Sequence, residues 1–255
     1  MIALEPPIDY LTATVPLYIQ IAEGLLARIE SGELTPGDRL PPERELSETL
    51  GVTRMTLRQA LRVLETQGLL VRRQGIGTYI AKPKIERAAG QLVPFTKVMQ
   101  QRGYATGARV IMLQRQPVEV AIANQLKLPV SAPVYYGHRL RLINQEPVML
   151  EKFIFPAHRF PNFEQHDLVN RSMYEIMETE YRIKVSQAQQ SLEAVSATEY
   201  EAGLLEIEVG APLMLEQRLG FDQNGRPIEF SKDLFRGDRF RFVTKVAPLE
   251  VEGEI

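Results

Sequence analysis

Residues 40–68, LPPERELSETLGVTRMTLRQALRVLETQG, limit the possible folds of this chain more than any other segment. A helix is expected to open at Leu40. The prolines and acids after Leu40 favour a first helical turn. Gly51 closes this helix, and Thr53 caps a second one that stops at Gly68. Two short helices with a four-residue connection predict a helix-turn-helix.

The second of these helices has two different faces. Its apolar stripe consists of Leu57, Ala60, Leu61 and Leu64, and its outer surface carries Arg54, Arg58, Gln59 and Arg62. From residue 53 to residue 82 there are six basic residues and one acid, a local net charge of +5, although the whole chain of 255 residues has a net charge of -2. A basic face is sufficient for phosphate affinity, but arginines on an amphipathic helix are more often simply solvated.

The flanking segments favour the DNA-binding interpretation. An apolar stripe four residues apart predicts a helix over Pro16–Ser31, and a turn is expected at residues 35–38. After Gly68, the sequence LLVRRQGIGTYIA predicts a β-hairpin. A Gly-x-Gly hairpin by itself is usually only a tight turn. Three helices, a hairpin and the basic segment at residues 53–82 together, however, predict a winged helix-turn-helix over residues 16–82.

Such a recognition helix enters the major groove with its N-terminus first, so base-reading residues gather in its first turns. Arg58 can contact guanine and Gln59 can pair with adenine. Thr53 and Thr56 offer hydroxyls, and Arg44 can hold a phosphate. Glycines in the wing allow a close approach to the duplex.

The C-terminal half has a different pattern. Residues 83–90 lack apolar periodicity and are expected to be a linker, although they could equally begin the next domain. Residues 91–246 mix short strands with helices and contain a weak repeat, in which residues 122–155 align with residues 202–235 and each copy predicts a short helix followed by a hairpin. The two copies predict one antiparallel sheet with helices on one face, an α+β domain.

Strand alternation places several polar side chains on one face of this sheet: Arg139, Arg141, Glu151, Glu229 and Ser231. The arginines can bind an anion and the carboxylates can bind hydroxyl or amino groups. Alternation alone, however, favours cross-strand salt bridges on a hydrated sheet face.

Composition excludes several classes of function. The chain has no cysteine, and its three histidines, at 138, 158 and 166, show no metal-ligand spacing. No run of about eighteen apolar residues and no signal-peptide pattern is present, so a cytoplasmic protein without a membrane partner is expected. We expect no cofactor and no enzymatic activity. A lyase-like enzyme and a DNA-binding protein whose second domain only dimerises remain the alternatives.

The N-terminal segment resembles the GntR-type winged helix. It contains the phrases G-x-x-x-P-G-D-x-L-P, E-R-E-L, V-T-R-x-T-x-R-x-A-L and G-x-G-T between residues 32 and 78. The resemblance implies DNA contacts at Arg44, Thr53, Arg54, Thr56, Arg58, Gln59, Gln74 and Gly75. Met55 stands where a small polar residue is common, so the operator sequence does not follow from the family.

The C-terminal segment resembles the UTRA effector-binding domain of the HutC subfamily, whose fold is like that of chorismate lyase. Its matching phrases are HRLRLINQEPVMLE, SMYEIM, LEQRLGFDQNGRPIEFS and FRGDRFRF. The resemblance implies a pocket lined by Arg139, Arg141, Glu151, Ser172, Glu229 and Phe235, with Phe95 and Thr96 in a covering loop at residues 93–96. Ser172 is also expected to cap a helix. Phe235 replaces a tyrosine that is usual in relatives that bind sugar phosphates, which weakens the case for an amino-sugar phosphate.

Together these features predict a homodimeric repressor on a palindromic operator. A small anionic metabolite, a sugar phosphate or a carboxylate, is expected to bind the C-terminal domain and to release the protein from double-stranded DNA.

Overall fold

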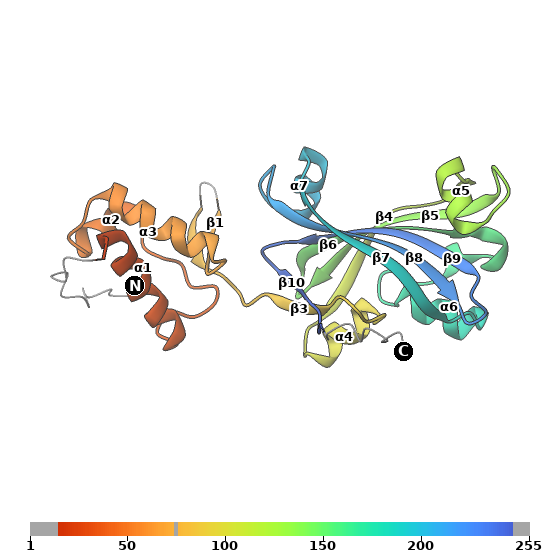
Figure 1. The fold of residues 1–255 in the computed structure, drawn as a ribbon, viewed down its shortest axis with the longest axis horizontal. Coiled ribbons are helices and arrows are strands. Elements are labelled where there is room, and N and C mark those ends of the chain that lie inside the picture. The colour runs from red at the N-terminus through yellow and green to blue at the C-terminus, as the bar shows by residue number, and fades with distance from the viewer. Residues whose placement is uncertain (1–14, 74–75, 247–255) are drawn as a thin grey trace, which may run out of the picture. The chain divides into compact units, whose positions relative to one another are not determined.

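The computed structural model describes residues 15–73 and 76–246, and the chain divides into two compact units at residues 85 and 86 (Figure 1). The first unit contains helices α1 (Leu17–Glu30), α2 (Glu43–Thr49) and α3 (Arg54–Thr66), followed by strands β1 (Leu70–Arg73) and β2 (Gly77–Ile80). The strands pair antiparallel, which confirms the expected hairpin. The expected turn residues Gln74 and Gly75 lie outside the described residues.

The apolar stripes predicted for the first unit form its core. Leu57, Ala60, Leu61 and Leu64 of α3 are all at most 1% exposed and pack with Ile21 and Leu25 of α1. Thr53 caps α3, because its hydroxyl accepts a hydrogen bond from the Thr56 amide. The three helices and the hairpin therefore form a winged helix.

The start of α2 differs from the prediction. The helix begins at Glu43 and not at Leu40, and Pro42 is its N-cap residue with φ -51° and ψ 142°. A residue that precedes a proline is displaced from the helical region by the proline ring. Leu40 and Pro41 both precede prolines, so neither begins the helix.

The second unit is built on a six-stranded antiparallel sheet in the order β4-β5-β6-β9-β8-β7. Its strands are β4 (Thr106–Pro117), β5 (Pro133–Ile143), β6 (Glu146–Pro156), β7 (Val185–Ser196), β8 (Pro212–Asp222) and β9 (Pro227–Arg236). Its helices are α4 (Phe95–Gln101), α5 (Val120–Leu126), α6 (Met173–Tyr181) and α7 (Glu199–Leu205), with 3-10 turns η1 (Ala157–Arg159) and η2 (Phe163–Gln165). This α+β architecture confirms the predicted fold class.

The two copies of the sequence repeat are related by a pseudo-two-fold axis through this sheet. The first copy gives α5, β5 and β6, the second gives α7, β8 and β9, and the two copies meet where β6 pairs with β9. Lys152 lies opposite Lys232 at this junction, and the repeat aligns the same two residues. The axis therefore passes between them.

Helices cover both faces of the sheet, and not one face only as the repeat predicted. The repeat helices α5 and α7 lie on one face, where Leu205 of α7 packs with Leu140 and Leu150 (Figure 1). Helix α6 packs on the other face through Met173, Ile176 and Met177, and α4 lies on this face beside β5. The face that carries Arg139 is therefore enclosed.

Half of the segment expected to be a linker forms a strand. Residues 85–88 are strand β3 (Ile85–Ala88), which pairs with β10 (Phe240–Val243) in a two-stranded sheet. The four residues of β3, Ile-Glu-Arg-Ala, do not alternate between apolar and charged side chains, so nothing local identifies the strand, and its partner lies about 155 residues away in the sequence. The strand also brings Arg87 to the second unit, where it is 8% exposed.

Candidate functional site

Two regions gather the residues predicted to be functional, one in each unit. In the first unit they lie on the outer face of α3 and at the start of α2. Arg44, Thr53, Arg54, Arg58 and Gln59 are exposed, and Thr56 is half-buried with its hydroxyl 2.9 Å from that of Thr53. The side chains around the N-terminus of α3 are therefore available to a duplex.

One acid, which was not identified as functional from the sequence, contacts several of the arginines on this surface. Glu43, the first residue of α2, accepts a hydrogen bond from Arg58 Nε at 2.6 Å and forms an ion pair with Arg72 at 3.3 Å. Arg54 lies 4.0 Å from the same carboxylate. Because the arginine side chains are about half exposed, these ion pairs contribute little to stability but orient the basic side chains on the surface.

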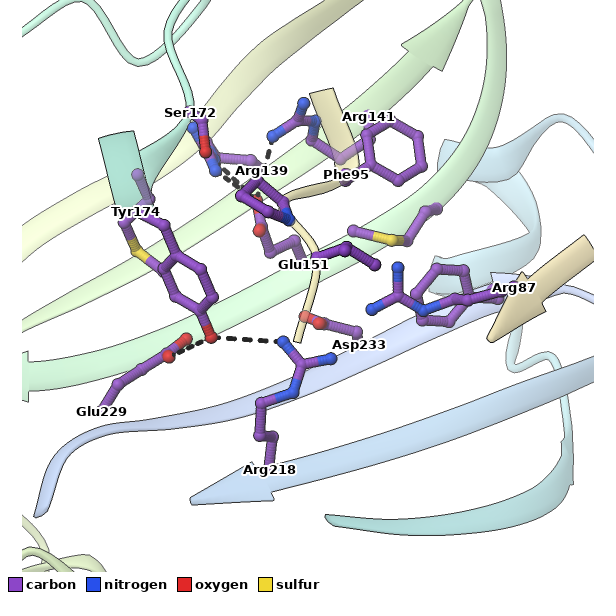
Figure 2. Close-up of a pocket in the computed structure, with 15 residues that line it drawn as sticks. Arg87, Phe95, Arg139, Arg141, Glu151, Ser172, Tyr174, Arg218, Glu229 and Asp233 are labelled. Atoms are coloured by element: carbon purple, nitrogen blue, oxygen red, sulfur yellow. Dashed lines mark hydrogen bonds and ion pairs between the residues drawn. The ribbon is translucent and has the colours of Figure 1, made fainter. Parts of the chain in front are cut away.

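In the second unit a pocket opens on the enclosed face of the sheet (Figure 2). Seven of the predicted residues line it: Phe95, Arg139, Arg141, Glu151, Ser172, Glu229 and Phe235. Thr96 does not line this cavity but lines a neighbouring groove of about 570 Å³. Ser231 lies on the same sheet face, where its buried hydroxyl has no hydrogen-bond partner, but it is not part of the pocket wall.

One end of the pocket is an arginine pair that shares a single carboxylate. Arg139 Nε donates to Glu151 Oε2 at 2.8 Å, and Arg141 Nη1 lies 3.6 Å from the same oxygen. Burial opposes ionisation of Glu151, but the two guanidinium groups outweigh it and lower the pKa of this carboxyl. With two cations and one anion, this end of the pocket carries a net positive charge.

The covering segment, residues 93–96, contacts Arg141 through Phe95 and Thr96, which lie in the first turn of α4 and not in the loop that the resemblance implied. Arg141 Nη2 donates to the Thr96 hydroxyl at 2.7 Å, and its guanidinium stacks on the Phe95 ring at 4.8 Å. Pro94, Ser172 and Tyr174 line both the inner cavity and the outer groove. The covering segment therefore stands between a small inner cavity, of about 30 Å³, and a larger open groove.

The opposite end of the pocket contains residues that the sequence prediction missed. Tyr174 donates to Glu229 at 2.6 Å and accepts from Arg218 at 3.2 Å, while Arg218 and Arg87 both bind Glu216. Burial raises the pKa of Glu229 to about 7, against the opposing effect of Arg218. Arg218 was detectable in advance, because the repeat aligns it with Arg139.

Two further side chains differ from their expected roles. Ser172 occupies the N-cap position of α6, but its hydroxyl makes no capping hydrogen bond and instead faces the pocket. Phe235 is 1% exposed, and the Arg87 guanidinium lies 4.9 Å from its ring centre. The aromatic ring therefore supports a cation where a tyrosine hydroxyl would offer a hydrogen bond.

Within the described ranges, no group of three or more potential metal-ligating side chains is present, and no helix is long and apolar enough to cross a membrane. A winged helix with an exposed basic recognition helix, followed by a domain with a charged internal pocket, defines a DNA-binding transcription regulator.

The comparisons with known proteins identify the family. The chain belongs to the gntR family of bacterial regulatory proteins, matched over residues 17–80, and carries a UTRA domain, matched over residues 101–241, as in the HutC subfamily. It is 38% identical to the HTH-type transcriptional repressor NagR of Bacillus subtilis, over 90% of this chain and 94% of that protein. It is 32% identical to the repressor MngR of Escherichia coli, over 89% of this chain and 94% of that protein.

A solved structure supports the same assignment. The crystal structure of PhnF from Mycobacterium smegmatis aligns with a TM-score of 0.63 and 30% identity, and the alignment covers 89% of this chain and 99% of that one. The protein is therefore a DNA-binding transcriptional repressor of the GntR/UTRA type.

Proposed function

We propose that this repressor leaves its operator when a small anionic metabolite, a sugar phosphate or a carboxylate, binds the pocket of the second unit. The observation that carries the proposal is the buried arginine pair. Arg139 and Arg141 are 1% and 3% exposed, and they share one carboxylate. Buried cations in excess of their partners are costly unless an anion completes the site.

The covering segment offers a physical route from binding to release. An anion that accepts hydrogen bonds from both arginines competes with Thr96 for Arg141 and removes the contact that holds the start of α4. An effector shifts a regulator between two states only as far as it prefers one of them. Rearrangement of residues 93–96 would supply that preference.

We further propose that the repressor acts in the cytoplasm as a homodimer without enzymatic activity. Two recognition helices related by a two-fold axis match a palindromic operator. Arg44, Thr53, Arg54, Thr56, Arg58 and Gln59 are the proposed DNA contacts from the helices, and Gln74 and Gly75 those from the wing.

Operator release by small anions tests this function. A duplex selected by the full-length protein from a random pool would be bound, and then titrated with phosphorylated sugars and carboxylates while fluorescence anisotropy is followed. We expect Arg139→Ala to bind the duplex with unchanged affinity but to resist release. Arg109→Ala, which removes an exposed arginine from β4, is the matched control and should respond normally.

The buried Glu151 loses its closest partner in Arg139→Ala, so Arg139→Lys is the second variant because it keeps the charge but loses the planar fork. Normal release of both variants would show that the pocket is not the effector site. If no anion releases the wild-type protein, the alternative of a second domain that only dimerises would stand.

A further inference from the structure

Three carboxylates lie side by side on the sheet face that carries the pocket, and two of them, Glu151 and Asp233, line the pocket. Strand register places Glu151 of β6 opposite Asp233 of β9, and Asp233 opposite Glu216 of β8. Neighbouring strands are about 4.8 Å apart, so all three acids fall within about 10 Å of one another. Like charges directly opposite each other destabilise a sheet unless they are neutralised.

The two outer acids are neutralised by arginines. Glu151 is bound by Arg139 and Arg141, and Glu216 is bound by Arg218 and by Arg87 at 3.1 Å. The donors of these arginines are therefore used by other partners, and Arg218 also donates a hydrogen bond to Tyr174.

Asp233, between them, has no such partner. It forms no hydrogen bond or ion pair within the described residues, its Oδ1 is buried without a hydrogen-bond partner, and the residue is only 4% exposed. It lines the pocket, and Figure 2 shows it between the Arg139–Glu151 pair and Arg218, with no dashed line reaching it. Burial and the nearby Glu151 raise the pKa of Asp233, and the charge of Arg218, which makes no direct contact with the carboxyl, opposes this effect only in part.

The fold itself does not require an acid here. The sequence repeat aligns Asp233 with Phe153, which is fully buried and lies over Gly137, with ring atoms where a Cβ of that residue would stand. An apolar side chain therefore satisfies the corresponding position of the first repeat. The acid in the second repeat is therefore not needed for packing, and its side chain lines the pocket.

We infer that Asp233 binds a protonated amino group of the effector, so that the ligand is a zwitterion with its anionic end on Arg139 and Arg141. This inference rests on the proposed function, because it assigns the ligand of the same pocket. An ammonium group supplies the direct partner that Asp233, alone among the three acids, lacks, and it brings up to three hydrogen-bond donors. The described residues offer no metal site that would supply this charge instead.

Matched pairs of probes test the inference with the full-length protein. Calorimetric titration would compare phosphoethanolamine with ethyl phosphate, glucosamine 6-phosphate with glucose 6-phosphate, and β-alanine with propionate. For at least one pair we expect the amine-bearing member to bind about tenfold or more tightly, the size expected for a buried charge-assisted hydrogen bond. Asp233→Asn should reduce that ratio to about one and leave the affinity for the amine-free member unchanged.

Two controls separate binding from folding. Thermal unfolding of the ligand-free Asp233→Asn protein should occur at the same or a higher temperature, because the substitution removes an unpaired buried carboxyl. Glu193→Gln makes the same acid-to-amide change at an exposed position of β7 and should leave the ratio unchanged.

The outcomes distinguish this inference from the proposed function. Equal binding of both members of every pair, a preference for the amine-free members, or a preference that persists in Asp233→Asn would overturn the ammonium site and leave the effector pocket standing. Failure of every probe, with or without an amine, to bind the wild-type protein would overturn the effector pocket itself.

Discussion

Individual buried charges set the chemistry of the pocket. Arg139 is 1% exposed, and its guanidinium donates hydrogen bonds to Glu151 and, at 2.9 Å, to the Leu168 carbonyl oxygen. Glu229 is also 1% exposed, but its hydrogen bond from Tyr174 does not compensate for lost hydration, and its pKa is raised. Residues on one sheet face therefore ionise differently because their partners differ.

Glu229 predicts a pH dependence of stability. Its pKa of about 7 in the folded protein lies above the ordinary value of 4.5, so the folded state retains a proton that the unfolded state releases. Stability from this group is present below pH 4.5 and is lost as the pH rises through about 7. We expect Glu229→Gln to unfold at higher urea concentration than wild type at pH 8, by at most on the order of 3 kcal/mol, and to match it near pH 4.

Urea unfolding at several pH values, followed by a probe of the second unit, measures this difference. Glu178→Gln, an exposed acid on α6, is the matched control and should show the wild-type profile. A gap between wild type and Glu229→Gln that does not widen from pH 5 to pH 8 would contradict the raised pKa.

At the scale of elements, α3 presents the proposed base-reading side chains and α2 orients them. The Thr53 cap fixes the start of α3, and Glu43 holds Arg58 at 2.6 Å. A side chain that leaves an exposed ion pair to meet a base loses little, because exposed pairs contribute less than about 1 kcal/mol. The arrangement therefore pre-positions Arg58 without locking it.

For this element we expect Arg58→Ala to weaken operator binding by about 1–3 kcal/mol and to relax base specificity at one position. Arg62→Ala, on the exposed surface of the same helix but farther from its N-terminus, should retain the base preference. Competition binding against single-base operator variants measures both effects. Unchanged operator affinity in Arg58→Ala would show that the recognition-helix assignment is wrong.

At the scale of the whole molecule, the chain has two units with separate hydrophobic cores. Leu61 is 1% exposed in the core of the first unit, and Leu205, the last residue of α7, is fully buried in the core of the second. Each core is formed by residues of its own unit, so damage to one is expected to leave the other folded.

We therefore expect Leu61→Ala to destabilise the first unit by about 2–5 kcal/mol and to weaken operator binding, while an anionic ligand still raises the melting temperature of the second unit. Leu205→Ala should do the reverse. Calorimetric scans with and without ligand separate the two transitions. Loss of the ligand-dependent shift in Leu61→Ala would contradict the independence of the units.

Prediction from sequence succeeded where the determining interactions are local. The helix of residues 54–66, its Thr53 cap and its buried leucines follow from contacts within a few residues, and the structure confirms them. The hairpin predicted for the first repeat also forms, and it turns at Asn144 and Gln145, which both have positive φ. Boundaries near proline were less certain, as the start of α2 shows.

The winged helix, the α+β class of the second domain and the residues that share a sheet face follow from the sequence alone, because helical and strand periodicities act over short distances. Which acids are paired depends instead on contacts between distant parts of the chain. Asp233 shares a sheet face with Glu229 on β9 just as Arg141 shares one with Arg139 on β5, and nothing local distinguishes Asp233. Its lack of a partner arises from the register of β6, β9 and β8 and from Arg87 on a distant strand, contacts between residues up to about 130 positions apart.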